Sequence, residues 1–405
     1  MQPVLTIRAG SKHLIREINQ AIVLDLVRRH GALSRTEIAA RSHLSLPTVS
    51  GITSELIDAG LLYEQATGVS TGGRRPVMIA FNAQAGYAVG IKLKEDAAVA
   101  VLTDLDAHVV AHHLAPIRKQ APEAIVAELA NVVKTLAPAA GAHPVVGVGI
   151  GMASVIDRRR DVVRYATYFG WQDLPLAQML GEQLDMPVVL DNDVNALAVA
   201  EQWFGAGRGV ADFVVISLGR GVGLGMILNG RLYRGTGGGA GEFGHIVMQP
   251  DGPICACGKR GCLEAFVSDP ALVRQVSAAL GRDATIDEAV RLAAQGDVAV
   301  SPIFHRAAEF LGIAVANLVN VLNPALVIIG GEGARAGNII LEPFRATLEK
   351  HTLGPLVKDV MVAIEPWGDD AWARGAASLL LSELFQPALH RGDEDRPSFN
   401  VLNMV

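Results

Sequence analysis

Residues 216–246 read ISLGRGVGLGMILNGRLYRGTGGGAGEFGHI, and residues 255–266 read CACGKRGCLEAF. The first stretch opens with two short apolar runs on either side of a glycine turn, which predicts two buried strands. The second stretch holds every cysteine of the chain: Cys255, Cys257 and Cys262. Strands of this kind, followed by a loop that gathers all the thiols, indicate an α/β domain with a ligand-holding loop.

The three cysteines follow the spacing Cys-x-Cys-x4-Cys, and His245 lies ten residues upstream of the first. One imidazole and three thiolates complete a tetrahedral zinc site with no open position, so the metal would be structural rather than catalytic. Gly258 and Gly261 would let the chain turn tightly around the ion. The alternative is three free buried cysteines, but clustered thiols in a cytoplasmic chain favour a metal.

Composition and charge bound the class of protein. Half of the 405 residues are hydrophobic, enough for the cores of two or three domains. Arg8, Lys12 and Arg16 interrupt any N-terminal apolar run, so we expect no signal peptide. No apolar stretch is long enough to span a bilayer, which predicts a soluble, cytoplasmic protein.

Charge is distributed unevenly along the chain. The net charge of −6 alone argues against nucleic acid as a partner. Residues 1–81, however, carry nine Lys and Arg against six Asp and Glu, a net charge of +3, which leaves −9 for the remainder. A basic segment on an acidic body is typical of a DNA-binding module joined to a sensor.

The N-terminal segment predicts three helices. Ser34 and Glu37 form the pattern of a capping box that opens a short second helix through Ala40. Ser45 should cap a third helix, with Pro47 in its first turn. The first helix ends at Gly31 and should face inward with Ile15, Ile18, Ile22 and Leu26. The third should face inward with Val49, Ile52 and Leu56.

Two short helices joined by a tight turn predict a helix-turn-helix, whose second helix enters a major groove. The alternative is a three-helix module that docks a protein. We expect DNA contacts from small polar residues of this helix and from one arginine: Arg35, Ser45, Thr48, Ser50 and Thr53.

Residues 60–64 (GLLYE) and 76–82 (PVMIAFN) predict two strands around a glycine-rich arm. This arm would present Arg74 and Arg75 to a narrow minor groove, where the negative potential attracts arginine. The alternative is a basic linker that lies on the acidic body. With the helices, the arm makes residues 1–81 a winged helix-turn-helix.

From residue 82 onward the pattern changes to alternating strands and helices. Strands are expected at residues 86–94, 97–105, 108–116 and 144–152, with a helix at 123–136. A second set of strands begins at 212–219 and 222–230. Two strand-rich halves predict a duplicated α/β body with a cleft between two lobes.

The opening stretches, VVLDNDVNALAVAEQWFGAG (188–207) and NLVNVLNPALVIIGGE (317–332) together resemble the ROK family of repressors, open reading frames and sugar kinases. The resemblance spans essentially the whole chain. The helix-turn-helix is similar to the branch of repressors that respond to N-acetylglucosamine, xylose or glucose. It implies an actin-like sugar-kinase body: lobe 1 over 82–191 with a returning helix at about 371–386, lobe 2 over 192–370, and a polar tail over 387–405.

The resemblance also implies the residues that bind a sugar between the lobes: Asn192, Asp193, Glu242, His245 and Glu264. Each hydroxyl of a polyol needs an acceptor, and leaving one unpaired costs about 1–3 kcal/mol. A loop fixed by zinc would present Glu264 and His245 rigidly, which saves ordering entropy on binding. Without the resemblance, Asp193 would be better explained as a helix cap.

Several positions depart from the pattern of ROK kinases. Ala153 and Ser154 replace a Pro-Gly pair, and Tyr168 replaces an Asn near the sugar, which predicts a reshaped pocket. Residues 92–96 read KLKED where kinases have Asp-x-Gly-Gly-Thr, and the Gly-Thr-Gly loop reads GRG at 219–221. Because phosphoryl transfer requires positioned and neutralised phosphates, we expect no kinase activity.

The sequence therefore predicts a sugar-responsive transcriptional regulator, most simply a repressor that releases operator DNA when a sugar enters the cleft. One alternative is an ATP-dependent sugar kinase with a DNA-binding head. Another is a repressor induced by a phosphotransferase-system protein. A homodimer or dimer of dimers on a palindromic operator is expected, with no membrane partner.

Overall fold

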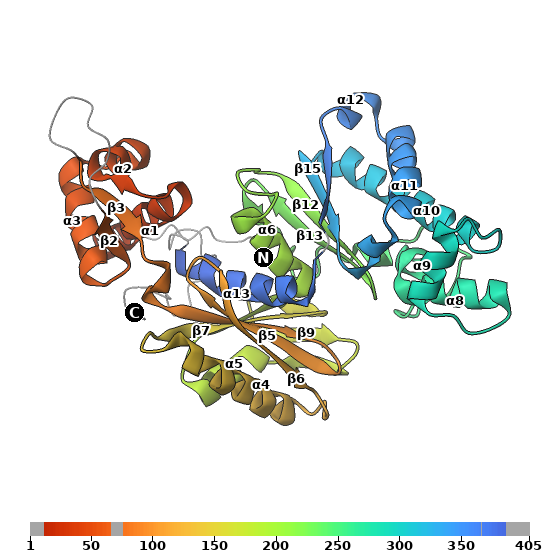
Figure 1. The fold of residues 1–405 in the computed structure, drawn as a ribbon, viewed down its shortest axis with the longest axis horizontal. Coiled ribbons are helices and arrows are strands. Elements are labelled where there is room, and N and C mark those ends of the chain that lie inside the picture. Colours follow the sequence, from red (N-terminus) through yellow and green to blue (C-terminus); the bar gives the residue numbers. More distant parts are fainter. Residues whose placement is uncertain (1–11, 66–75, 366, 386–405) are drawn as a thin grey trace, which may run out of the picture.

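The structure is a computed structural model that describes residues 12–65, 76–365 and 367–385. Figure 1 shows a small head at the left of the view and two larger α/β lobes, one below the centre and one at the upper right. No helix within the described ranges is long and apolar enough to cross a membrane. The predicted fold class, a winged head on a two-lobed α/β body, is confirmed.

The head combines three helices with an antiparallel sheet in the order β1-β3-β2. Its elements are α1 (Lys12–His30), β1 (Leu33–Ser34), α2 (Arg35–Ser42), α3 (Leu46–Asp58), β2 (Leu62–Gln65) and β3 (Met78–Phe81). The two strands expected around the glycine-rich arm are therefore present and paired. Arg74 and Arg75 of the arm, like the tail over 387–405, lie outside the described residues.

Side-chain caps determine where two helices of the head begin. The hydroxyl of Ser34 accepts the N–H of Glu37, and the Glu37 carboxylate accepts the N–H of Ser34, so the capping box is confirmed. Ser45 caps α3 by accepting the N–H of Thr48. The expected inward face of α3 is also confirmed, because its buried side chains include Val49, Ile52 and Leu56.

The expected inward face of α1 is wrong. Ile15 is 51% exposed, and Ile18, Ile22 and Leu26 are only partly buried. The fully buried apolar side chains are instead Val23, Leu24 and Val27. They belong to a cluster that also contains residues of the body. α1 therefore packs against both the head and the body, and the spacing of its apolar residues does not reveal the contact with the body.

Lobe 1 is built on a five-stranded sheet in the order β11-β7-β4-β5-β6. Its strands are β4 (Tyr87–Leu93), β5 (Ala97–Asp104), β6 (Val109–Pro116), β7 (Val145–Met152) and β11 (Val188–Asn192). β4 is antiparallel to β5 and parallel to β7. A small sheet beside it has the order β10-β9-β8 and contains β8 (Val155–Asp157), β9 (Val162–Ala166) and β10 (Trp171–Leu174).

Helices cover both faces of the lobe 1 sheet. Figure 1 shows α4 (Pro122–Leu136) and α5 (Leu176–Leu184) below it and α13 (Asp369–Phe385) above it. A Cβ atom at Gly90 or Gly149 would overlap the backbone of α13, so glycine at these positions permits the close approach. The last described helix of the chain thus packs directly on lobe 1.

Lobe 2 is built on a second five-stranded sheet, in the order β14-β13-β12-β15-β16. Its strands are β12 (Phe213–Leu218), β13 (Val222–Leu228), β14 (Arg231–Leu232), β15 (Leu326–Gly330) and β16 (Met361–Glu365). Its helices are α7 (Glu264–Val267), α8 (Asp269–Leu280), α9 (Ile286–Ala294), α10 (Ser301–Leu322), α11 (Asn338–His351) and α12 (Gly354–Val357). Short 3-10 turns occur in both lobes. Those of lobe 1 are η1 (Ala83–Ala85) and η2 (Ala137–Ala140), and those of lobe 2 are η3 (Phe243–His245) and η4 (Glu332–Ala336).

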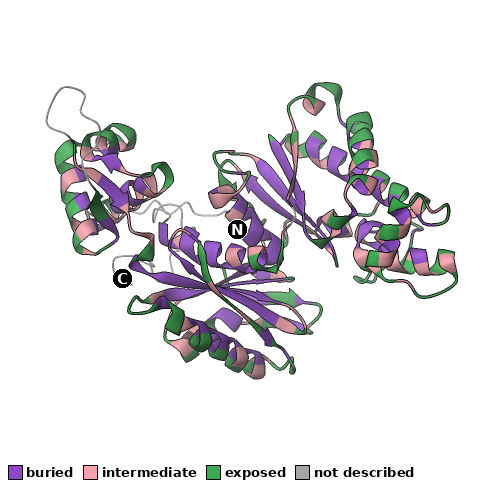
Figure 2. Cartoon of the chain, viewed as in Figure 1, coloured by how far each residue is buried: buried purple, intermediate pink, exposed green. Residues whose placement is uncertain are grey.

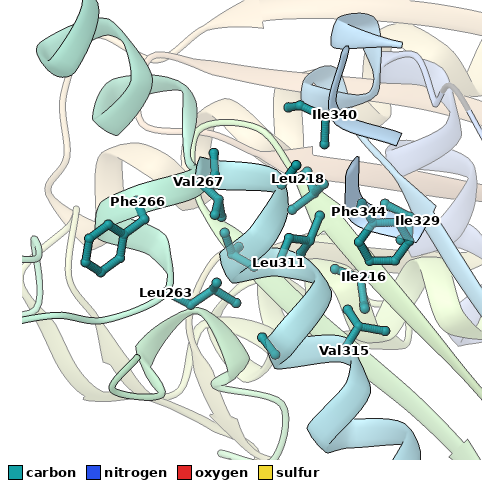
Figure 3. Close-up of a cluster of buried hydrophobic side chains, with 14 of the residues drawn as sticks. Ile216, Leu218, Leu263, Phe266, Val267, Leu311, Val315, Ile329, Ile340 and Phe344 are labelled. Atoms are coloured by element: carbon teal, nitrogen blue, oxygen red, sulfur yellow. The ribbon is translucent and has the colours of Figure 1, made fainter. Parts of the chain in front are cut away.

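Buried residues concentrate in the two sheets and on the helix faces turned toward them (Figure 2). The core of lobe 2 joins Leu311 and Val315 of α10 to Ile216 and Ile329 of the sheet and to Phe344 of α11 (Figure 3). Between the two lobes runs α6 (Asp193–Phe204), which packs against β13 of lobe 2 and against α13. The division of the body at residue 191 remains a proposal, because α6 has contacts on both sides of it.

Candidate effector cleft, metal centre and DNA-binding surface

Four side chains of lobe 2 form a compact ligand cluster, with all ligand atoms within 4.8 Å of one another: His245, Cys255, Cys257 and Cys262. The Sγ atom of Cys255 lies 3.6 Å from Nδ1 of His245, and the Sγ atoms of Cys257 and Cys262 are 3.7 Å apart. Tetrahedral zinc with Zn–S bonds of about 2.3 Å requires S–S separations of about 3.7 Å. A disulfide would need about 2.05 Å. The cluster therefore fits a tetrahedral ion.

The backbone around the cluster is shaped for such an ion. Gly258 and Gly261 have φ angles of +85° and +71°, so the expectation that these glycines make tight turns is confirmed. Burial raises the pKa of the Cys255 thiol to about 12. A bound cation would supply the positive charge that a thiolate needs at this buried position.

His245 connects the cluster to the cleft. While Nδ1 faces Cys255, its Nε2 lies 3.8 Å from a carboxylate oxygen of Glu242. One imidazole can therefore serve the metal with one nitrogen and meet Glu242 with the other. A metal ligand whose second nitrogen contacts a carboxylate is held in one orientation and one tautomer.

Glu264 is fixed from three sides. Leu263, Phe266 and Val267 beside it are buried in the core of lobe 2 (Figure 3). Its Oε2 accepts the N–H of Val222 at 3.2 Å, and its Oε1 lies 3.6 Å from the Sγ of Cys255. The loop that holds the cysteines thus presents this carboxylate rigidly.

Asn192 caps α6, and Asp193 does not. The side-chain oxygen of Asn192 accepts the N–H groups of Val194 and Asn195 at 2.9 and 3.4 Å, and its amide donates to the carbonyl of Ser154. The interpretation of Asp193 as the helix cap is therefore wrong. The carboxylate of Asp193 follows the cap and points to a different partner.

That partner is Lys92 of β4. Its ammonium group donates to Oδ2 of Asp193 and lies 4.3 Å from the ring centroid of Trp372. Both side chains of the pair are 11% exposed. The sequence analysis missed this contact, although one signal was present: Lys92 is the lone charge in the otherwise apolar strand YAVGIKL. A buried ammonium without a counter-charge is costly, so such a lysine implies a buried acid nearby.

Three of the expected sugar-binding side chains, Asp193, Glu242 and Glu264, lie close enough to one another to interact electrostatically. Burial raises the pKa of Glu242, and the carboxylates of Glu264 and Asp193 raise it further, which places the three acids in one region. Burial also raises the pKa of Tyr168, and the charges of Glu264 and Asp193 act in the same direction. Tyr168 therefore lies near the same acids, and its effect on the shape of the pocket stays a prediction.

Asp191 holds this region in place through buried hydrogen bonds, a role that was not predicted from the sequence. Its carboxylate accepts hydrogen bonds from Arg234 at 2.6 Å and from Asn195 at 2.9 Å. Burial alone would raise the pKa of Asp191, but Arg234 and Arg158 hold it below its usual value. Because Arg234 comes from lobe 2, this pair ties the two lobes together beneath Asn192.

The loops at residues 92–96 and 219–221, whose sequences depart from the phosphate loops expected in ROK kinases, contact each other. Arg220 donates to the Glu95 carboxylate at 2.8 Å, and its guanidinium lies 5.1 Å from the ring centroid of Tyr168. Lys94 is paired with Asp369. A Cβ at Gly219 would overlap the carboxylate of Glu332, so a further acid borders the glycine loop.

The exposed side of α3 is only partly as expected. Ser45 and Thr48 are exposed, and Ser50 is partly exposed. Thr53 is fully buried, and its hydroxyl accepts the Nε–H of Arg35 at 3.0 Å, so Thr53 cannot reach a base edge from this position. Arg35 is further tied to Glu64. Exposed positions of α3 that were not named as DNA contacts include Gly51 and Ser54.

Comparison with known proteins places this architecture. A model described as the ROK family matches residues 88–383, and a model described as the MarR family matches residues 17–66. The chain belongs to the ROK family. Its head coincides with the MarR-type region, and its cleft and cysteine loop lie within the ROK region.

Relatives of this ROK protein are similar over nearly their full length. The xylose repressor of Caldicellulosiruptor bescii is 31% identical over 391 residues, covering 93% of this chain and 98% of the relative. The dual regulator NagC of Escherichia coli is 28% identical over 364 residues, covering 87% and 90%.

The solved structures that resemble this chain include both a regulator and a kinase of the ROK family. A ROK family transcriptional regulator, a homologue of the Escherichia coli MLC protein, has a TM-score of 0.83 at 26% identity and covers 92% of this chain and 97% of its own. A ROK family glucokinase from Streptomyces griseus, in complex with glucose and AMPPNP, has a TM-score of 0.63 at 32% identity. It covers 73% of this chain and 99% of its own.

The metal centre generates the first prediction. Purified protein should contain close to one zinc ion per chain by elemental analysis. Cys257→Ser should lose the metal and lower the thermal midpoint by roughly 5–10 °C, because a structural site contributes directly to folding. Ala256→Ser, at an exposed position between two of the ligands, should keep both the metal and the stability. A metal-free wild-type protein of normal stability would contradict the assignment.

The buried ion pair generates the second prediction. Lys92→Met and Asp193→Asn should each lower the free energy of unfolding by about 3–5 kcal/mol, because each leaves its partner buried and unpaired. The double variant should recover most of that loss, which urea titration will measure as a coupling energy. The exposed pair of Arg160 and Asp173, joined at 2.7 Å, is the matched control and should show at most about 1 kcal/mol. Additive effects at Lys92 and Asp193 would show that the pair does not form.

Proposed function

We propose that this ROK protein is a sugar-responsive transcriptional repressor that binds operator DNA through its winged head and releases it when a sugar occupies the cleft. One observation carries this proposal: the cleft keeps its converging carboxylates while Lys92 holds the acid that ROK kinases use as a base. The relatives named xylose repressor and NagC support the regulatory role.

A cleft of this kind binds without turnover. A general base must have a free oxygen within reach of the proton that it removes. Both oxygens of Asp193 are engaged, one by Lys92 and the other by the N–H of Val194. A remaining lone pair can accept a hydrogen bond from a sugar hydroxyl without breaking the buried ion pair, whereas taking up the proton would leave Lys92 buried without its counter-charge. Asp193 is therefore proposed as a binding group.

The phosphate loops also disfavour ATP. Phosphates need backbone N–H groups and cations that are free to meet them. Here Arg220 is bonded to Glu95, and Glu332 borders the glycine turn, so the positive charge is already neutralised and further acids line the site. We therefore propose that the protein lacks kinase activity.

The effector is proposed to be a neutral sugar held by Asn192, Asp193, Glu242, His245 and Glu264. Carboxylates accept hydrogen bonds from the hydroxyl groups of a polyol, and the Nε2–H of a His245 bound to metal through Nδ1 can donate to a hydroxyl oxygen. The clustered negative charge opposes an anionic ligand. Zinc is proposed as the structural ion that keeps the lobe 2 half of this set rigid.

DNA contacts are proposed for the exposed part of α3 and for the basic arm: Ser45, Thr48, Ser50, Arg74 and Arg75. Thr53 is removed from that set, and Arg35 is proposed to position β2 against α3 rather than to read a base. A homodimer on a palindrome remains the expected assembly.

An effector screen generates the third prediction. D-xylose, D-glucose and N-acetyl-D-glucosamine should be tested for a rise in thermal midpoint, since a ligand at 100 times its Kd stabilises the folded state by about 2.7 kcal/mol. The active sugar should weaken operator binding on the order of 10–100-fold, and operator should weaken sugar binding by the same factor. Glu264→Gln should lose the response while keeping operator affinity. If no neutral sugar shifts the midpoint, the effector proposal is wrong.

The same screen tests for catalysis. No sugar phosphate should form from ATP with any sugar that stabilises the protein. Asp193→Asn is the control for background hydrolysis. Phosphate transfer above that background would reverse the assignment to a non-enzyme.

Gly51 generates the fourth prediction. It lies exposed in the middle of α3, with nothing within 4 Å of the position of a Cβ atom. Alanine in an exposed helix interior is more stabilising than glycine by about 0.5–1 kcal/mol. Gly51→Ala should therefore raise the stability of the protein yet weaken operator binding about tenfold, because the added methyl group would meet the DNA. Thr36→Ala on the exposed face of α2 is the control. Stronger or unchanged binding by Gly51→Ala would remove α3 from the interface.

A further inference from the structure

An arginine of the DNA-binding head is buried in the body. The side chain of Arg28, in the last turn of α1, is only 4% exposed. Its guanidinium lies 4.0 Å from the ring centroid of Trp203 and 5.6 Å from that of Phe385. It is also bonded to Asp106 at 3.3 Å and to Asp25 of its own helix at 3.1 Å.

These contacts join the head to three separate elements of the body. Trp203 lies in the last turn of α6, Phe385 ends α13, and Asp106 lies in the turn between β5 and β6. A second bond nearby is donated by Arg208, just beyond α6, to the backbone carbonyl of Arg29. The junction therefore depends on the relative positions of α6 and lobe 1.

α6 reaches from this junction to the proposed effector site, and α13 runs the same way, with Phe385 at the junction and Trp372 beside Lys92. The twelve residues of α6 span about 18 Å at 1.5 Å per residue, with Asp193 at one end and Trp203 near the other. Gly223 and Gly225 of β13 and Gly375 of α13 let the backbone of α6 approach so closely that a Cβ would overlap it or its side chains. So tightly held a helix moves as a rigid body.

The two faces of α6 belong to different partners. Val194, Leu197 and Ala198 pack in a cluster with strands of lobe 2. Ala196, Val199 and Trp203 pack in the cluster that contains lobe 1, α13 and the head. A change in the angle between the lobes must therefore shift α6 against at least one of them.

The chemistry of Arg28 makes the junction sensitive to such a shift. A buried guanidinium has to keep its counter-charges and its aromatic contacts together. Among the described atoms, its Nε has no hydrogen-bond partner, so the site has no spare acceptor to replace one that moves away. Arg28 cannot follow Trp203 and keep Asp106 at the same time.

We propose that Arg28 is the positioning residue that fixes the DNA-binding head against α6 and lobe 1, so that displacement of α6 at its effector end reorients the head. The inference rests on the proposed function for the operator and the effector. It adds the residue through which the head senses the body.

Hydrogen exchange tests the junction without operator or sugar. In full-length Arg28→Met, amide exchange in residues 104–108 and 200–206 should rise about tenfold, because the two segments lose their shared partner. Arg29→Met is the matched control: Arg29 is 52% exposed on the same turn and also pairs with Asp25, so exchange should stay at the wild-type rate. Asp106→Asn should reproduce the effect of Arg28→Met in a background that keeps the aromatic contact. Unchanged exchange in both Arg28→Met and Asp106→Asn would overturn the proposal.

Operator spacing tests the consequence for DNA. On a palindrome selected from random DNA with the wild-type chain, a one-base-pair change in half-site spacing should cost the wild type and Arg29→Met at least about tenfold in affinity. Arg28→Met and Asp106→Asn should lose less than about threefold, because a loosely held head adapts to either spacing. If both variants keep the wild-type spacing preference, Arg28 does not orient the head. If the wild type selects no operator, the proposed function fails, and hydrogen exchange alone decides the junction.

Discussion

The buried contact between Lys92 and Asp193 is the constraint on which the rest of the cleft depends. The two residues are 101 positions apart, and their bond joins β4 of lobe 1 to the first turn of α6. Because neither charge can be left buried alone, this contact fixes the start of the interlobe helix relative to the sheet. The pair also engages the carboxylate of Asp193, and this contact is the observation behind the proposal that the site binds a sugar without turnover.

Two rigid units meet at this cleft. On one side, the cysteine loop holds His245 and Glu264 through backbone turns, core packing and a metal-binding cluster. On the other side, Asn192 caps α6 and Asp191 pairs with Arg234, so both side chains hold this part of the site in place. A ligand that contacts both units would be sensitive to the angle between them, as the proposed regulatory role requires.

Much of this fold was predictable from sequence because the signals are local. Ser34 and Glu37 lie three residues apart and cap α2 as expected, and the spacing of the cysteines alone indicated the metal cluster. The failures involve contacts between distant segments. Lys92 was recognised only as a missing phosphate ligand, since nothing near it reveals Asp193. Thr53 was expected on the exposed side of α3, but its side chain is buried and its hydroxyl accepts a hydrogen bond from Arg35 of the preceding helix.

The return of α13 to lobe 1 has a consequence for the order of synthesis. The sheet of lobe 1 is complete by residue 192, yet the helix that covers one of its faces ends at Phe385. At about 5–20 residues per second, a ribosome needs roughly 10–40 s to synthesise the residues between these two points. During that time one apolar face of the lobe 1 sheet is not covered by α13. Phe385 also contacts the guanidinium of Arg28. Until Phe385 has been synthesised, the head therefore lacks one of its contacts with the body. The head is synthesised before the body, but it can take its final orientation only after Phe385 has left the ribosome.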